Sequence, residues 1–285
     1  MKFLRLPYAA RFTLNMFYVF FLDRLPNVLL FEMKKLCKFF GIENHKMLKT
    51  LELFLGKFEY GPLVNRYTLL LLTPDLSKLY CPIYDGWIVR EIYLSKVYDR
   101  FFEPNAGFTV VDAGAHVGLY TLKAARKVGK EGLVVSFEPD PYAYKLLVAN
   151  VKMNNFDQNV IPINMALADF QGKAVFYSSA RPSWGAYGSL EPFAKIEKKR
   201  IEVQVGKLDD VMEKLRLRHY DLLKVDVEGY ELEVLLGAQK TLKNTSMVVV
   251  AAYHSEGEVE AVKSLLKSKG FRTVFSKSSF VYALR

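Results

Sequence analysis

From residue 108 onward, short apolar runs alternate with amphipathic stretches. Apolar runs of this length are typical of buried strands, and apolar residues at helical spacing indicate the helices between them. The predicted strands span 108–112, 132–137, 160–166, 221–226, 247–253, 271–275 and 280–284. The predicted helices span 119–128, 141–153, 208–215, 231–242 and 259–269. The alternation predicts an α/β fold in which helices cover both faces of a mostly parallel sheet.

The end of the chain departs from this alternation. Only residues 276–279 separate the last two predicted strands, which leaves no room for a helix. The two strands therefore form a hairpin, and one antiparallel strand lies at or near an edge of the sheet. Two further short strands are predicted at 174–177 and 201–205.

The chain before residue 107 is organised differently. Two short strands are predicted between residues 67 and 84, on either side of Thr73-Pro74-Asp75, and a helix at 89–102. Apolar residues at 47–55 follow a helical spacing. We divide the chain into a basic, aromatic helical extension (1–60), a small strand and helix lead-in (61–106) and an α/β domain (107–285).

The composition is that of a globular protein, since 51% of the 285 residues are hydrophobic and 25% are charged. This excludes a disordered, collagenous or low-complexity chain. Cys37 and Cys81 supply neither a disulfide framework nor a metal-ligand cluster. A reduced, cytoplasmic protein is therefore expected.

The net charge of +10 is unevenly distributed. Residues 1–60 hold ten Lys and Arg against five Asp and Glu, giving +5, and the remaining 225 residues hold 30 against 25, also +5. A helical extension packed on the domain is the favoured interpretation, and a helix of residues 1–40 attached peripherally to a membrane surface is the alternative. The apolar run Met16–Leu22 is short for a span, which needs about 20 residues. No small-residue cleavage site follows it, which disfavours a signal peptide.

The strongest chemical signal follows the strand at 108–112. Asp112 stands at the carboxyl end of this strand, and Gly114 and Gly118 follow in the turn before the next helix. In an open α/β sheet, ligands bind beyond the carboxyl ends of the strands. The glycines lie four residues apart, unlike G-x-G-x-x-G, and no Lys-Ser/Thr pair completes a P-loop. The turn is predicted to bind a ligand, and a tight turn without a ligand is the alternative.

The next strand supplies a second signal. Glu138 follows its last residues, and an acid at this place can accept hydrogen bonds from both hydroxyls of a ribose. An adenosine-like ligand would then face Glu138 and Gly118. The alternative for Glu138 is a solvated charge at a strand end.

With these residues in place, the chain resembles the FkbM family of S-adenosylmethionine-dependent methyltransferases. The resemblance rests on five blocks in order: VVDAGAHVGLYTL (110–122), SFEPDPYAYKLLVANVKMN (136–154), ALADFQGKAVFY (166–177), KLDD (207–210) and LLKVDVEGYELEVLLGA (222–238). It implies a Rossmann-like class I methyltransferase fold with seven strands in the order 3-2-1-4-5-7-6, one of them antiparallel. It also implies S-adenosylmethionine as the methyl donor and, in most members, a hydroxyl as the acceptor.

The resemblance also implies residues that bind the cofactor. Glu138 would take the ribose hydroxyls, Pro139 would flank the adenine, and Ala166 and Leu167 would lie near the adenine edge. The methionine and ribose end would be lined by Asp112, Gly114, Ala115, His116 and Gly118. The family often has Asn at the place of His116, so a donor that contacts the cofactor is expected there.

Asp226 and Glu228 place two carboxylates at the end of the strand at 221–226. Methyl transfer to an alcohol requires loss of the hydroxyl proton, which a carboxylate can accept. Asp226 is predicted to be the base or positioning group, with Glu228 supporting it. Two carboxylates could also hold Mg²⁺, although no metal site is predicted. Alternatively, Glu228 only caps the following helix or pairs with a lysine.

His254 ends the strand at 247–253 and is a further candidate base near Asp226 and Glu228. A histidine satisfied within a loop is the alternative. The sequence departs from the family here, because Ala252 stands where members often have an acid.

A polar and aromatic loop spans residues 178–189, where the family places residues that face the substrate. Arg181, Trp184 and Tyr187 could stack on and hydrogen-bond an acceptor, or they could form a surface hairpin.

Three classes of function follow. O-methylation of a hydroxyl on a glycan, a lipid or another small molecule is favoured. A nucleic-acid methyltransferase is disfavoured, because enzymes that grip a flipped base often carry N-P-P-Y or D-P-P-Y where this chain has Asp226-Val-Glu-Gly. A non-catalytic, membrane-associated protein that retains the fold is the third. The sequence does not identify the acceptor.

Overall fold

The computed structural model describes residues 68–82, 85, 87–179 and 198–285. The predicted helical extension at 1–60 lies outside the described residues. Within the described part of the chain, no helix is long and apolar enough to cross a membrane.

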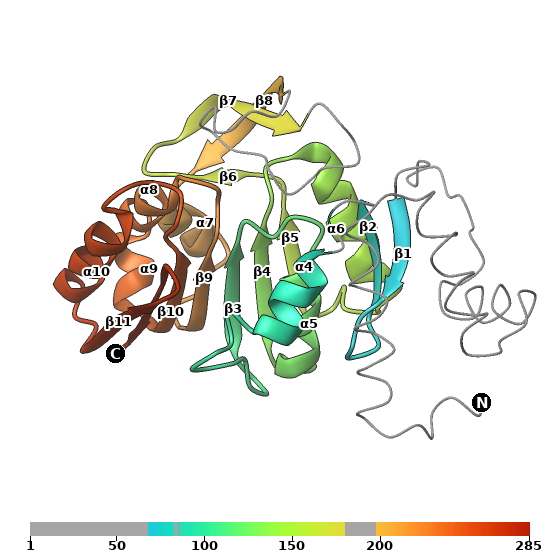
Figure 1. Ribbon diagram of the computed structural model, residues 1–285, viewed down its shortest axis with the longest axis horizontal. Helices are drawn as coiled ribbons and strands as arrows, with labels where there is room; N and C mark the ends of the chain where they lie inside the picture. The colour runs from blue at the N-terminus through green and yellow to red at the C-terminus, as the bar shows by residue number, and fades with distance from the viewer. Residues whose placement is uncertain (1–67, 83–84, 86, 180–197) are drawn as a thin grey trace, which may run out of the picture.

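A seven-stranded sheet forms the centre of the protein (Figure 1). Its order is β11-β12-β10-β9-β3-β4-β5, with β12 antiparallel to both of its neighbours and every other pairing parallel. When these seven strands are renumbered 1 to 7 in chain order and read from the β5 edge, their order is 3-2-1-4-5-7-6, as expected. The predicted fold class is therefore confirmed. The strands are β3 (Thr109–Ala113), β4 (Leu133–Phe137), β5 (Val160–Ile163), β9 (Tyr220–Val225), β10 (Thr245–Ala251), β11 (Thr273–Lys277) and β12 (Phe280–Leu284).

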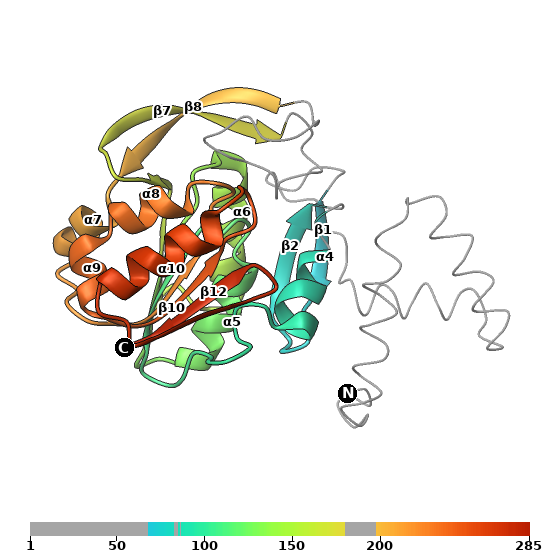
Figure 2. The same cartoon turned by 60° about the vertical axis from the view of Figure 1, so that its left-hand side comes forward.

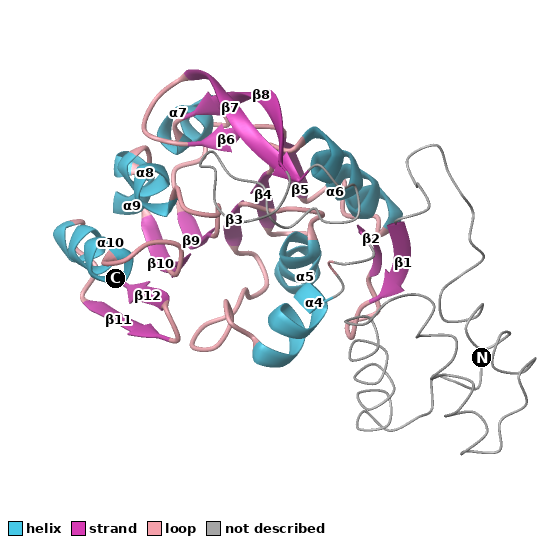
Figure 3. Ribbon diagram, turned by 45° about the horizontal axis from the view of Figure 1, so that its top comes forward, coloured by secondary structure: helices cyan, strands magenta, loops and turns pink. Residues whose placement is uncertain are grey.

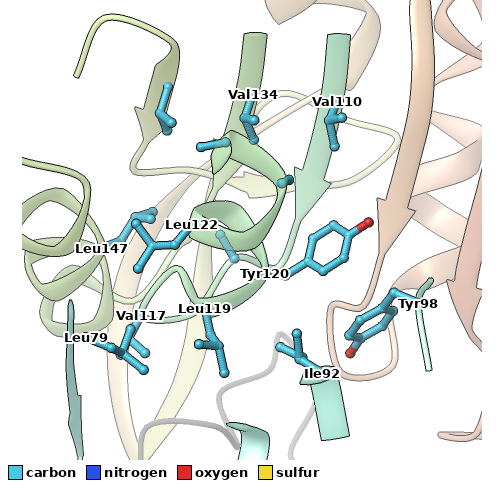
Figure 4. Close-up of a cluster of buried hydrophobic side chains, with 14 of the residues drawn as sticks. Leu79, Ile92, Tyr98, Val110, Val117, Leu119, Tyr120, Leu122, Val134 and Leu147 are labelled. Carbon is cyan, nitrogen blue, oxygen red and sulfur yellow. The ribbon is translucent and has the colours of Figure 1, made fainter. Parts of the chain in front are cut away.

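Helices cover both faces of the sheet (Figure 2). Because successive side chains of a strand point to opposite faces, Val110 and Val134 pack with α5 (Leu119–Val128) and α6 (Pro141–Met153). Figure 4 shows this cluster of buried side chains. The helices of the other face are α7 (Leu208–Lys214), α8 (Glu231–Leu236), α9 (Gln239–Lys243) and α10 (Glu258–Ser268).

A small second sheet lies above the carboxyl ends of the central strands (Figures 1 and 3). Its order is β6-β8-β7, with β6 (Ala166–Leu167), β7 (Gly172–Ser179) and β8 (Lys198–Gly206). The short strands predicted at 174–177 and 201–205 are therefore confirmed as parts of β7 and β8.

The lead-in packs beside α5 and α6 (Figure 2). It contains the antiparallel pair β1 (Thr68–Leu72) and β2 (Lys78–Pro82), then α4 (Trp87–Val89) and the π-helix η2 (Arg90–Ser95). The buried Asn150 of α6 binds β2, since its side chain accepts the Tyr80 N–H (2.6 Å) and donates to the Tyr80 carbonyl (2.9 Å).

The helix predicted at 89–102 is wrong in its second half, because helical structure ends at Ser95. Lys96 follows in the left-handed region (φ 48°), which turns the chain inward. Asp99 is then buried, where it forms an ion pair with Lys123 and accepts a hydrogen bond from the Tyr120 hydroxyl (3.1 Å). These polar contacts hold the chain around Asp99 in a turn, so the helix does not continue to residue 102.

The helix predicted at 231–242 is also divided in two. A side chain at Gly237 would overlap the Ala168 carbonyl oxygen, so the chain approaches the β6 region too closely for any other residue. The backbone breaks there into α8 and α9.

The turn between β3 and α5 shows the closest backbone approach. Gly114 has a φ of +81°, and a Cβ atom on it would overlap the Asp226 carbonyl oxygen. The Asp226 N–H in turn donates to the Ala113 carbonyl (3.0 Å). The turn after β3 is therefore pressed against the end of β9.

We expect Gly114→Ala to lower the free energy of unfolding by about 3 kcal/mol or more, because it adds overlap with main chain to the strain of a positive φ. The matched control is Gly257→Ala, which has a similar φ of +78° but no atom within 4 Å of the new Cβ, and should cost about 1–2 kcal/mol. Urea denaturation of both variants tests this. Equal losses would show that the close approach is not a constraint.

Candidate functional site

A cleft lies at the carboxyl ends of β3, β4 and β9, which are neighbours at the centre of the sheet. Many of the residues proposed from the sequence line it: Gly114, Ala115, His116, Glu138, Pro139, Ala166, Leu167, Asp226 and Glu228. The structure thus brings the ends of three strands and the start of the small sheet to one cavity.

Two of the expected cofactor-binding residues do not line the cleft. Asp112 is fully buried beneath it, where it accepts a hydrogen bond from the Thr121 hydroxyl (2.6 Å) and pairs with Lys224 (3.0 Å). Gly118 begins α5 with a φ of +89° and packs against Leu147. Both residues support the turn after β3, and their contact with a cofactor stays a prediction.

The proposed acceptor residues Arg181, Trp184 and Tyr187 lie outside the described residues. Their roles stay predictions.

Glu138 and His116 are held together at the ends of β4 and β3. Glu138 accepts the N–H of His116 (2.7 Å) and the N–H of Asp140 (2.8 Å), one with each carboxylate oxygen. Burial raises the pKa of Glu138 to about 7, although the His116 charge and the two N–H groups oppose the rise. Each oxygen keeps a lone pair that could accept a ligand hydroxyl.

The His116 ring is anchored from the lead-in. Its Nε2 lies 3.3 Å from a carboxylate oxygen of the buried Asp85. Burial lowers the pKa of His116, but the hydrogen bond to Asp85 and its charge outweigh this, so the pKa is raised. The ring is therefore fixed at the wall of the cleft as a donor.

Asp226 follows β9 and faces both the cleft and the lead-in. Its Oδ2 accepts a hydrogen bond from the Tyr98 hydroxyl. Its Oδ1 is buried and has no hydrogen-bond partner among the described residues. An unpaired buried carboxylate oxygen in a cleft is costly unless a ligand uses it, which marks this atom as a functional candidate.

Glu228 and His254 form an ion pair next to Asp226. The His254 Nε2 lies 3.3 Å from Glu228, which has a φ of 59° in the left-handed region. The topological prediction that His254 lies beside the end of β9 is thus confirmed. Burial lowers the pKa of His254, but the hydrogen bonds to Glu228 and Glu231 raise it to about 10. His254 therefore carries a proton at neutral pH, which disfavours it as the base.

Two groups in the described part of the chain place their donor atoms within 4.8 Å of one another, as a metal ion would require: Asp226, Glu228 and His254, and Glu231, His254 and Glu258. Both share His254, whose two nitrogens already face carboxylates. We assign no metal to either group.

The sequence analysis missed several residues of the cleft wall: Glu91, Tyr98, Lys224 and Tyr253. Glu91 and Tyr98 come from the lead-in, and burial together with the Asp226 charge raises the pKa of Glu91 to about 7. The available signal was the presence of polar residues inside otherwise apolar stretches, such as Lys224 within LLKVD.

The sheet order, the glycine turn after its first strand and the acid after its second define a class I S-adenosylmethionine-dependent methyltransferase fold. A model of the Methyltransferase FkbM domain matches residues 112–273. The protein belongs to the FkbM family of methyltransferases.

Curated relatives agree with this assignment. Methyltransferase 1 of Beauveria bassiana is 30% identical over 201 residues, covering 65% of this chain and 80% of the relative. The 31-O-demethyl-FK506 methyltransferase FkbM of Streptomyces tacrolimicus is 27% identical over 217 residues, covering 66% and 82%. The hexuronic acid methyltransferase AglP of Haloferax volcanii is 27% identical over 158 residues, covering 55% and 61%.

The pKa of Glu138 generates a test of cofactor binding. We expect the ribose hydroxyls of the cofactor to donate to the ionised Glu138 carboxylate. Because the ionised fraction falls below pH 7, the affinity for S-adenosylmethionine should then be about tenfold lower at pH 6 than at pH 8. Titration calorimetry at both pH values measures this. Glu138→Gln should bind weakly with little pH dependence, whereas the exposed-site control Glu131→Gln should behave as wild type. Equal affinities of the wild type at both pH values would contradict the role of Glu138.

Proposed function

We propose that this methyltransferase transfers the methyl group of S-adenosylmethionine to a hydroxyl of a glycan, a lipid or another small molecule. The observation that carries the proposal is the buried, unpaired Oδ1 of Asp226 at the wall of the cleft. A carboxylate with one free oxygen in this position can accept the proton that an acceptor hydroxyl must lose.

The cleft fits the cofactor. The free lone pairs of Glu138 suit the two ribose hydroxyls, and Pro139, Ala166 and Leu167 offer an apolar wall for the adenine. Gly114 and Ala115 let the backbone approach the methionine end. When bound, S-adenosylmethionine supplies a methyl group on a positively charged sulfur.

The side chains around Asp226 have different roles in the proposed reaction. The Tyr98 hydroxyl binds Oδ2 and so orients the carboxylate with Oδ1 facing the acceptor side. Oδ1 would accept the hydroxyl proton while the acceptor oxygen bonds to the methyl carbon and the bond from that carbon to the sulfur breaks. Glu228, paired with the protonated His254, adds negative charge beside this place and supports the positioning of the acceptor.

The relatives support a hydroxyl acceptor only through their names. The Streptomyces relative is named as an O-methylating enzyme of a small molecule, and the Haloferax relative as an enzyme acting on a hexuronic acid. Arg181, Trp184 and Tyr187 remain candidates for contacting the acceptor.

We also propose that the chain acts in the cytoplasm as three parts, at 1–60, 61–106 and 107–285. Residues 1–60 hold ten basic residues against five acidic ones, and this net charge of +5 supports peripheral attachment of residues 1–40 to an anionic membrane surface.

Asp226→Asn should lower turnover by about 10²–10⁴-fold, because it removes the proton acceptor, while the affinity for S-adenosylmethionine changes little. The assay follows labelled methyl groups into separated lipid, glycan, small-molecule and RNA fractions of an extract from the source cell. The product should resist mild alkali, as an ether does and a methyl ester does not.

Label that enters RNA alone, or that mild alkali releases as methanol, would contradict the proposal. Asp169→Asn is the control, since Asp169 is exposed and does not line the cleft.

A further inference from the structure

Glu231 is the first residue of α8, three residues after Glu228, and its side chain is fully buried. Its Oε1 accepts the N–H of Val227 (2.9 Å), and its Oε2 accepts the N–H of Gly229 (3.0 Å). These two N–H groups flank Glu228, whose backbone is in the left-handed region. One buried carboxylate therefore holds the strained turn that presents Glu228 to the cleft.

The same carboxylate also holds His254. Oε1 of Glu231 lies 3.3 Å from the His254 Nδ1, while Nε2 on the other side of the ring lies 3.3 Å from Glu228. The Tyr253 ring lies against the imidazole, with centroids 4.2 Å apart, and Glu258 accepts the His254 backbone N–H (2.9 Å). Each ring nitrogen thus faces one carboxylate, and the side chain is only 9% exposed.

We propose that Glu231 is a positioning residue of the acceptor site, which orders Glu228 twice, through the turn of residues 227–229 and through the ring of His254. This inference rests on the proposed function, because it names Glu231 as the residue that holds Glu228 in the proposed acceptor site. Glu231 does not line the cleft and so acts only through other residues.

The chemistry of a buried ring explains why Glu231 is needed. A protonated imidazole has two N–H donors, and a donor that is buried without an acceptor destabilises the folded protein. Without Glu231, the protonated Nδ1 would lose the carboxylate that it faces, and the ring would rotate or lose its proton. Either change would release Glu228 from Nε2.

A purely structural role makes a different prediction. If Glu231 only caps the turn and the first residues of α8, its loss should act independently of His254. If Glu231 also acts through the ring, its loss should matter less once His254 is gone, because only its support of the turn is then lost. A double-mutant cycle separates the two cases, because coupled residues give non-additive effects.

The cycle compares Glu231→Gln, His254→Asn and the double variant in the labelled-methyl assay. We expect each single change to lower kcat about 10–100-fold with little change in the KM for S-adenosylmethionine, and the loss in the double variant to be clearly smaller than the product of the two single losses. Multiplied losses in the double variant would overturn the proposal. Glu260→Gln on α10 is the matched control, because Glu260 is 76% exposed and pairs with Lys263 on the surface of the same helix.

A spectroscopic readout needs no acceptor and keeps the test separate from the proposed function. The protein has 4 histidines, so the ring N–H proton signals of His254 can be assigned by their loss in His254→Asn. The Nδ1–H signal should be present in the wild type and in Glu260→Gln, and absent in Glu231→Gln. If Glu231→Gln does not fold, Glu231→Asp is measured instead; because it keeps the negative charge, it should retain the signal. An Nδ1–H signal that Glu231→Gln leaves unchanged would overturn the inference even if methyl transfer is found. Failure of methyl transfer with this pattern of signals would instead contradict the proposed function alone.

Discussion

The buried ion pair between Asp112 of β3 and Lys224 of β9 is the interaction on which the site depends. The two residues are direct neighbours in the parallel sheet, their side chains are 0% and 3% exposed, and their charges lie 3.0 Å apart. Burial lowers the pKa of Lys224, but the charges of Asp112 and Asp226 raise it by more than burial lowers it. The net shift is upward, so the side chain keeps its proton. Lys224 also donates to the Gly114 carbonyl (2.7 Å), which ties the turn between β3 and α5 to β9. Removal of one partner would leave a buried charge uncompensated.

The rest of the cleft follows from this fixed point. With the turn tied down, the Asp226 main chain lies against Gly114, and only glycine fits there. The Tyr98 ring lies 5.2 Å from the Lys224 ammonium, and its hydroxyl binds the Asp226 side chain. Because Asp99 pairs with Lys123 of α5, the chain around Tyr98 is held in place from the second side. The lead-in is therefore part of the site wall, although the family match begins at residue 112.

The sequence predicted what local pattern and topology determine. Apolar runs and helical spacing predicted the central strands, the resemblance to the FkbM family implied their order, and the acids at strand ends indicated Glu138 and Asp226 as site candidates. The features that could not be predicted from the sequence depend on contacts between residues far apart in the chain. The helix at 89–102 ends early because Asp99 turns inward to Lys123, and the helix at 231–242 breaks because Gly237 meets the main chain at Ala168. The pairing of Asp112 with Lys224, which buries both side chains, depends on the alignment of two strands far apart in the sequence and was not predicted.

Lys224→Met tests the central claim most directly, since it keeps the length of the side chain and removes its charge. Urea unfolding with and without S-adenosylmethionine measures both consequences on one protein. We expect the free energy of unfolding to fall by about 3–5 kcal/mol and the stabilisation by the cofactor to disappear, because Asp112 loses its partner and the turn loses its anchor. A variant as stable as the wild type, and stabilised equally by the cofactor, would contradict the account.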